Sequence, residues 1–238
     1  MASDGGVNRF AAVLSGLPVE SWDAYLTEHS GLPGPRANLE LADAFATAAT
    51  REDALAHAHS ADEYLRFCGT QALGVVLAKD AGANDLGMLL KERASDASWR
   101  VREAAARGLQ FVGDVSPEQL CVIAAEWQGD ANPYVRRAAV AALAEPRLLV
   151  HDEVWTQAMA SCVAATAWLA ELPAEVRRQP GVRALRTALG YCWSVVVAAS
   201  PQRGLPEFEA LRSSTDRDVQ WVVRSNLAKA RLRRLMPD

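Results

Sequence analysis

The 238-residue chain lacks most of the patterns that support metal binding or covalent catalysis. Its four cysteines stand singly, with no Cys-x-x-Cys pair to suggest a zinc or dithiol site. Its glycines form no phosphate-binding loop, and no serine stands in a nucleophile-elbow pattern. His57 and His59 would diverge by about 200° on a helix, and no third ligand accompanies them. We therefore expect no catalytic residue, no metal site and no cofactor, and we favour a protein that is not an enzyme.

Long apolar runs are also absent. No stretch approaches the roughly 18–20 apolar residues that a membrane span needs, and residues 1–6 lack the basic and apolar regions of a secretory signal. Half of the residues are hydrophobic and 23% are charged, which is typical of a folded globular chain. We expect a cytoplasmic monomer with no membrane partner.

Alternating β-branched segments bounded by hairpin turns are missing, so the sequence predicts helices throughout. Asn38 is expected to cap a helix that carries Phe45. Proline predicts helix starts at Pro117, Pro133 and Pro206, the last beginning a short helix that ends near residue 213. The expected helices cover residues 5–16, 19–29, 60–78, 83–93, 98–112, 116–128, 132–145, 151–171, 180–199 and 218–234.

What the chain does contain is a recurring aliphatic-Arg pair at the start of runs rich in Ala and Leu. The aliphatic positions are separated by 36, 34, 47 and 41 residues. A period near forty in a helical pattern indicates stacked helix pairs. These positions are Leu65, Val101, Val135, Val182 and Val223.

Residues 96–109 and 130–143 carry the fullest copies, with an Asp five residues before Val-Arg and a Leu eight residues after the Val. This pattern resembles the second helix of a HEAT repeat. We expect an all-α, right-handed α-solenoid of about five HEAT-like helix pairs. Residues 1–37 would form an N-terminal helical cap, and residues 38–238 a single continuous solenoid domain.

The repeated acidic and basic residues have an expected structural role. Asp96, Asp130 and Asp218 lie at or just before predicted helix starts, where an acidic side chain satisfies amide donors and complements the helix dipole. The arginines six residues later should hydrogen-bond to inter-helix loops or to an Asp of an adjoining repeat. These arginines are Arg102, Arg136 and Arg224.

Charge is unevenly spread and guides the expectation about partners. Residues 1–98 carry 7 basic and 14 acidic side chains, and the remainder carries 18 and 15. We expect a macromolecule on the concave face, and the acidic N-terminal half favours a protein or peptide over a nucleic acid, although arginines suit phosphate well. The proposed partner-binding residues are Arg100, Arg107, Arg137, Arg186 and Tyr191.

A second resemblance supports the alternative of a DNA-binding protein. Arg137-Ala-Ala-Val and Ala188-Leu-Gly-Tyr191 are similar to motifs of the HEAT-like-repeat alkylpurine DNA glycosylases. The resemblance implies that Arg137 contacts the DNA backbone and that Tyr191 helps to form a cleft. Those enzymes use an Asp in a Trp-Asp-x-Val-Asp-like segment, whereas Trp99-Arg-Val-Arg102 has Arg at that position. The resemblance therefore implies a DNA-binding relative of these DNA-repair enzymes, either active or catalytically inactive.

Aromatic residues leave two interpretations open. Trp99, Tyr134 and Trp221 lie near the starts of predicted second helices, and Tyr191 and Trp193 fall in one later helix. Aromatic rings there either pack between helices or stack on bases and anchor an interface.

Overall fold

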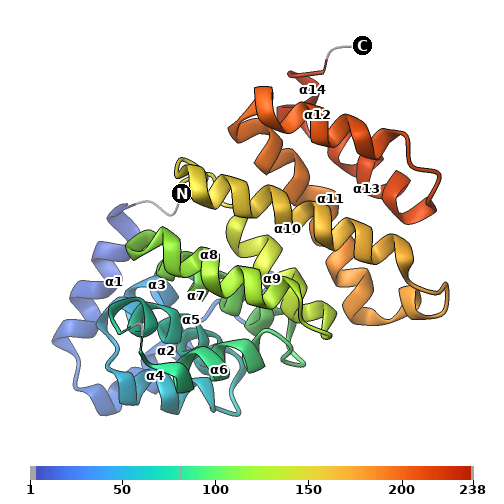
Figure 1. The fold of residues 1–238 in the computed structure, drawn as a ribbon. Helices are drawn as coiled ribbons and strands as arrows, with labels where there is room; N and C mark the ends of the chain where they lie inside the picture. The colour runs from blue at the N-terminus through green and yellow to red at the C-terminus, as the bar shows by residue number, and fades with distance from the viewer. Residues whose placement is uncertain (1–3, 81, 237–238) are drawn as a thin grey trace. The chain divides into compact units, whose positions relative to one another are not determined.

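The computed structural model describes residues 4–80 and 82–236, and within these it contains helices and no strand (Figure 1). The chain divides into two compact units, residues 1–115 and residues 116–238. The first unit contains α1 (Asp4–Gly16), η1 (Val19–Ser21), α2 (Trp22–Glu28), α3 (Leu39–Ala48), α4 (Arg51–Ala58), α5 (Glu63–Lys79), α6 (Asn84–Arg93) and α7 (Trp99–Val115).

The second unit has the same helix-pair organisation. It contains α8 (Pro117–Gln128), α9 (Pro133–Leu143), α10 (Asp152–Glu171), η2 (Val176–Arg178), α11 (Pro180–Ala199), α12 (Pro201–Arg212), α13 (Arg217–Leu227) and α14 (Ala230–Arg233).

Five helix pairs follow the N-terminal helices, which confirms the predicted all-α solenoid class. The pairs are α4 with α5, α6 with α7, α8 with α9, α10 with α11, and α12 with α13. Inside the first unit, second helix α5 packs on α7, and inside the second unit α9 packs on α11 and α11 on α13 (Figure 1). Small residues permit these contacts, since Ala105 and Ala139 are fully buried.

The second helices begin with a repeated hydrogen-bond pattern. The capping side chains of Asp62, Ser98, Asn132 and Asp216 each accept an amide hydrogen bond from the first turn of their helix. Two residues earlier, a Ser or Asp oxygen accepts the capping residue's own amide, as Asp96 does from Ser98 at 2.8 Å. Free amide donors at these helix starts are thereby satisfied, as predicted for Asp96 and Asp130. The prediction for Asp218 is wrong, because Asp216 caps α13 and the Asp218 carboxylate binds Arg177 and Arg186 instead.

The repeated arginines bind the preceding loops in three of the pairs. Arg102 donates to the Asp96 carbonyl at 2.6 Å, and Arg136 donates to the Asp130 and Gln128 carbonyls, both at 2.6 Å. Arg66 donates in the same way to the Ser60 carbonyl at 2.7 Å. The predicted role of Arg102 and Arg136 is confirmed.

The prediction for Arg224 is wrong, because the last copy of the motif is shifted by one helical turn. In α7, Val101 lies three residues after the capping Ser98. In α13 the capping residue is Asp216, and Val219 lies three residues after it. Gln220 therefore stands where the loop-binding arginine would be. The side chain of Arg224 is exposed and makes no hydrogen bond or ion pair to the described residues.

Most helix starts agree with the sequence, including the Asn38 cap of α3 and the proline starts of α8 and α9. Two differ near the C-terminus. α12 begins at Pro201 and contains Pro206 inside it, because Pro201 takes the first helical position. The expected helix 218–234 is two helices, α13 and α14. No helix in the described part of the chain is long and apolar enough to span a membrane.

Candidate functional site

Two of the residues proposed from the sequence, Arg100 and Arg107, hold the first unit together. Arg100 donates to the Gly34 carbonyl at 3.1 Å and to Glu63 at 3.3 Å, and its guanidinium lies 4.9 Å from the ring centroid of Trp99. The side chain thus ties α7 to α5 and to the loop before α3.

Arg107 takes part in a polar chain across three neighbouring helices of the first unit. It donates to Asp43 of α3 at 2.6 Å and to Gln71 of α5 at 3.0 Å, and Gln71 also donates to Asp43 at 2.5 Å. Charge-assisted bonds of this kind fix the register of the helices. The Arg107 guanidinium is therefore already engaged before any partner binds.

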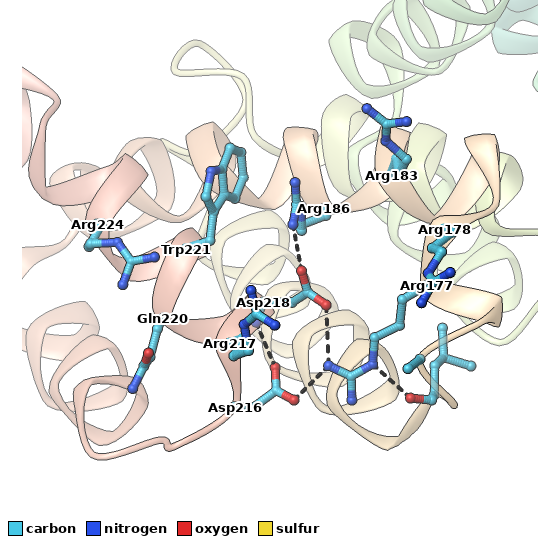
Figure 2. Close-up of a pocket in the computed structure, with 12 residues that line it drawn as sticks. Arg177, Arg178, Arg183, Arg186, Asp216, Arg217, Asp218, Gln220, Trp221 and Arg224 are labelled. Atoms are coloured by element: carbon cyan, nitrogen blue, oxygen red, sulfur yellow. Dashed lines mark hydrogen bonds and ion pairs between the residues drawn. The ribbon is translucent and has the colours of Figure 1, made fainter.

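The second unit contains a pocket of about 780 Å³ whose lining is rich in arginine (Figure 2). Its wall comes from the segment after α10, from the first half of α11 and from α13 as far as Arg224. Of the five residues proposed from the sequence, Arg186 lines it, whereas Arg137 and Tyr191 are not in its lining. The lining residues are Leu172, Ala174, Arg177, Arg178, Arg183, Arg186, Asp216, Arg217, Asp218, Gln220, Trp221 and Arg224.

A network of ion pairs lies among the lining residues of this basic pocket. Arg177 donates to Asp216 at 2.6 Å, to Asp218 at 3.2 Å and to the Leu172 carbonyl at 2.7 Å. Arg186 donates to the other carboxylate oxygen of Asp218 at 2.5 Å (Figure 2). Both acidic side chains are thereby neutralised by arginines that come from outside α13.

Asp216 is ionised in this setting. Partial burial would raise its pKa, but the hydrogen bonds from Arg177 and from the backbone amides of Val219 and Asp218 outweigh that effect. Together they hold the pKa of Asp216 below its ordinary value.

Trp221 is packed into the same network. The guanidinium of Arg186 lies 4.5 Å from its ring centroid, a cation–π distance. The ring edge lies against Gly190 of α11, where an added Cβ would be 2.7 Å from Cζ3 of Trp221. The glycine of the Ala188-Leu-Gly-Tyr191 motif thus makes room for this indole.

Four arginines of the pocket are exposed and make no hydrogen bond or ion pair through their side chains to the described residues. They come from three segments of the second unit, η2, α11 and α13. Since Arg177 and Arg186 already balance the two aspartates, these four carry the uncompensated positive charge of the basic pocket. They are Arg178, Arg183, Arg217 and Arg224.

Most of this set does not stand out in the sequence. Arg183 and Arg224 follow the aliphatic residues of the repeat motif, and Arg177, Arg178 and Arg217 belong to no motif. The detectable signals are the Arg177-Arg178 doublet two residues before Pro180 and the basic balance of the C-terminal part. Neither signal indicates that α11 and α13 lie side by side, which is what brings these side chains together.

The remaining proposed residues lie elsewhere in the second unit. Arg137 is half-buried on α9 and engages in interactions of its own. Tyr191 is 46% exposed, and its hydroxyl accepts a hydrogen bond from Arg231 at 2.9 Å. The Arg231 guanidinium lies 4.7 Å from the Tyr191 ring centroid, and the Lys229 ammonium lies 5.7 Å from it. Tyr191 is thus an exposed ring flanked by cations.

Comparison with known proteins supports the fold and no closer assignment. No protein-family model matches the chain, and no curated protein sequence matches it. Among solved structures, smu.31 from Streptococcus mutans UA159 is similar, with a TM-score of 0.56 and 16% identity over 92% of this chain and 95% of that one. AlkD2 from Streptococcus mutans is similar too, with a TM-score of 0.57 and 16% identity over 93% and 98% of the two chains. The protein therefore has a HEAT-like helical-repeat fold.

Proposed function

We propose that the protein is a non-enzymatic interaction module, and that the basic pocket of residues 116–238 binds an anionic macromolecule. The observation that carries this proposal is the set of four exposed arginines in one pocket whose side chains have no partner among the described residues. Guanidinium groups bind phosphate and carboxylate groups in bidentate geometry, so both nucleic acids and acidic protein segments offer the required chemistry.

The pocket is built to present these charges. Unpaired like charges repel one another, and Asp216 and Asp218 reduce that repulsion while holding Arg177 and Arg186 in place. A ligand therefore contacts an ion-pair network that is already in place. The four exposed arginines form new hydrogen bonds or ion pairs when it binds.

Fluorescence anisotropy tests this proposal with two labelled probes, an acidic peptide and an oligonucleotide, at about 50 mM salt. The wild type should bind at least one probe. Arg183→Ala/Arg224→Ala should weaken binding by roughly ten-fold, because two charge-assisted contacts are removed. Arg233→Ala/Arg234→Ala removes two exposed arginines of the same unit that lie outside the pocket, and it should change affinity much less.

The proposal is wrong if neither probe binds at low salt, or if both double variants lose affinity equally. The first outcome would show that the pocket binds neither class of anionic macromolecule. The second would mean that diffuse positive charge, and not the basic pocket, attracts the probe.

The second candidate function is DNA binding by a relative of the alkylpurine DNA glycosylases. It is favoured by the fold likeness to AlkD2 and by the Arg137 and Tyr191 motifs. The segment Trp99-Arg-Val-Arg102 still lacks the acidic residue on which that chemistry depends, so an inactive relative fits better. Anisotropy with duplex DNA across a salt series should show weaker binding for Arg137→Ala if this candidate is right.

A further inference from the structure

The basic pocket contains, among its arginines, an aromatic ring and an amide that suit nucleobases. We propose that its occupant is a segment of single-stranded nucleic acid, with phosphates on the exposed arginines and a base against Trp221. This inference rests on the proposed function, because it names the class of anion that the pocket receives.

Basic and aromatic side chains alternate along α13. Arg217, Trp221 and Arg224 are spaced by four and three residues, so they lie on one face of the helix. The two arginines are two turns apart, about 10 Å along the helix axis. Cation, aromatic ring and cation in a row match a strand in which phosphates and unstacked bases alternate.

Trp221 is held in place by its neighbours before a ligand binds. Its edge lies over Gly190, and Arg186, itself held by Asp218 at 2.5 Å, lies over the ring. The part of the indole that lines the pocket is therefore presented in one orientation. Stacking a base there costs little side-chain ordering.

An amide side chain lies next to Trp221 in α13. Gln220 is exposed on the pocket wall, and its amide nitrogen donates a long hydrogen bond of 3.4 Å to the Ser214 carbonyl. A primary amide offers both donors and an acceptor, which is what a base edge needs. The basic pocket thus combines phosphate-binding and base-binding groups within the second unit.

The same groups argue against the other anions. In a duplex the bases are stacked on one another, so the indole of Trp221 has no ring to stack on. An acidic peptide presents carboxylates but no planar base. An unpaired strand offers a phosphate to the arginines and a base ring to Trp221 in every nucleotide.

The test compares labelled oligothymidylate of about 12 nucleotides with an abasic strand that has the same number of phosphates. The full-length protein should bind the thymidylate strand at least about five-fold more tightly, which is the gain expected from stacking one base. Trp221→Leu should abolish this difference and leave abasic binding unchanged. Trp221→Phe should retain most of it. Arg217→Ala/Arg224→Ala should weaken binding of both strands.

Other outcomes separate this inference from the proposed function. Equal affinity of the wild type for both strands, or tighter binding of duplex DNA or of an acidic peptide, overturns the single-strand inference while the anion-binding function stands. Binding of none of these probes overturns the function itself. The wild-type comparison needs no substitution, so it decides the question even if Trp221→Leu fails to fold by circular dichroism.

Discussion

At the scale of single residues, Asp96 illustrates how the helix starts are stabilised. Its carboxylate accepts from Arg66 at 3.0 Å, from Arg93 at 3.1 Å and from the Ser98 amide at 2.8 Å, and its side chain is only 7% exposed. Burial would raise its pKa, but the Ser98 amide and the arginines outweigh burial and lower the pKa below its usual range. One carboxylate thus accepts the amide hydrogen bond of the residue that caps α7, and it forms ion pairs with two half-buried arginines.

We predict that Asp96→Asn lowers the free energy of unfolding by about 3 kcal/mol at neutral pH, because Arg66 loses its ion pair with Asp96 and Arg93 keeps only its ion pair with Glu92. The folded-state pKa of Asp96 is lowered, so its stabilising effect is fully present above about pH 4 and is lost as the pH falls through the folded-state value. Urea unfolding should therefore show a difference between variant and wild type that narrows in acid. Glu52→Gln, an exposed control in the same unit, should change little.

The register of the last repeat gives a second prediction at this scale. Arg136→Ala should cost about 2 kcal/mol, since three loop carbonyls lose a donor and the contact of the guanidinium with Trp168, at 4.5 Å, disappears. Arg224→Ala should change stability by less than about 0.5 kcal/mol, because its side chain has no intramolecular partner among the described residues. Equal losses in thermal unfolding would show that our assignment of the register is wrong.

At the scale of elements, α5 and α7 approach so closely that only glycine fits at their crossing. A Cβ added to Gly74 would lie 2.1 Å from the carbonyl oxygen of Gly108, which belongs to the backbone and cannot move aside cheaply. The second helices of the first unit therefore pack backbone to backbone at this point.

Gly74→Ala should consequently destabilise the protein by at least about 2 kcal/mol through overpacking. Gly87→Ala in α6 is the matched control, because an added Cβ there meets only a Leu77 methyl group at 4.0 Å. Alanine favours helix over glycine, so this variant should be more stable by roughly 0.5–1 kcal/mol. Denaturant titration measures the free energy of unfolding of both variants. A Gly74→Ala variant that is more stable than the wild type would contradict the close backbone contact between α5 and α7.

The elements are also where prediction from sequence succeeded best. Caps such as Asn38 and proline starts such as Pro117 are local signals, because a helix start is decided by a few consecutive residues. The predicted helix start at Pro206 is wrong because a proline one turn into a helix gives the same sequence signal as a proline at the helix start. Val223-Arg224 misled because Val219 repeats the same face one turn earlier, so periodicity alone does not select the register.

At the scale of the whole molecule, charge separates by unit. Residues 1–115 carry 10 basic and 16 acidic side chains, whereas residues 116–238 carry 15 and 13. Net charge therefore disfavours an anionic ligand on the first unit and favours it on the second, and the exposed arginines of the basic pocket add positive charge locally.

If single-stranded nucleic acid engages all four arginines, the logarithm of the binding constant should fall with the logarithm of salt with a slope of about −3. Arg217→Ala/Arg224→Ala should reduce the slope to about −1.5, because two phosphate contacts are lost. Anisotropy titrations over a salt series measure both values. A slope that is the same in variant and wild type would show that these arginines do not contact phosphates.

The sequence by itself determined most of the helices, several of their caps and the repetition of helix pairs, because those depend on periodicity and on neighbouring residues. It did not indicate α4. It did not determine which arginines are available to a partner. Arg107 and Arg183 look alike in the sequence, yet Arg107 is bound to Asp43, 64 residues away, and Arg183 remains exposed. Only the tertiary structure decided this, since an arginine's availability depends on the carboxylates that distant helices bring to it.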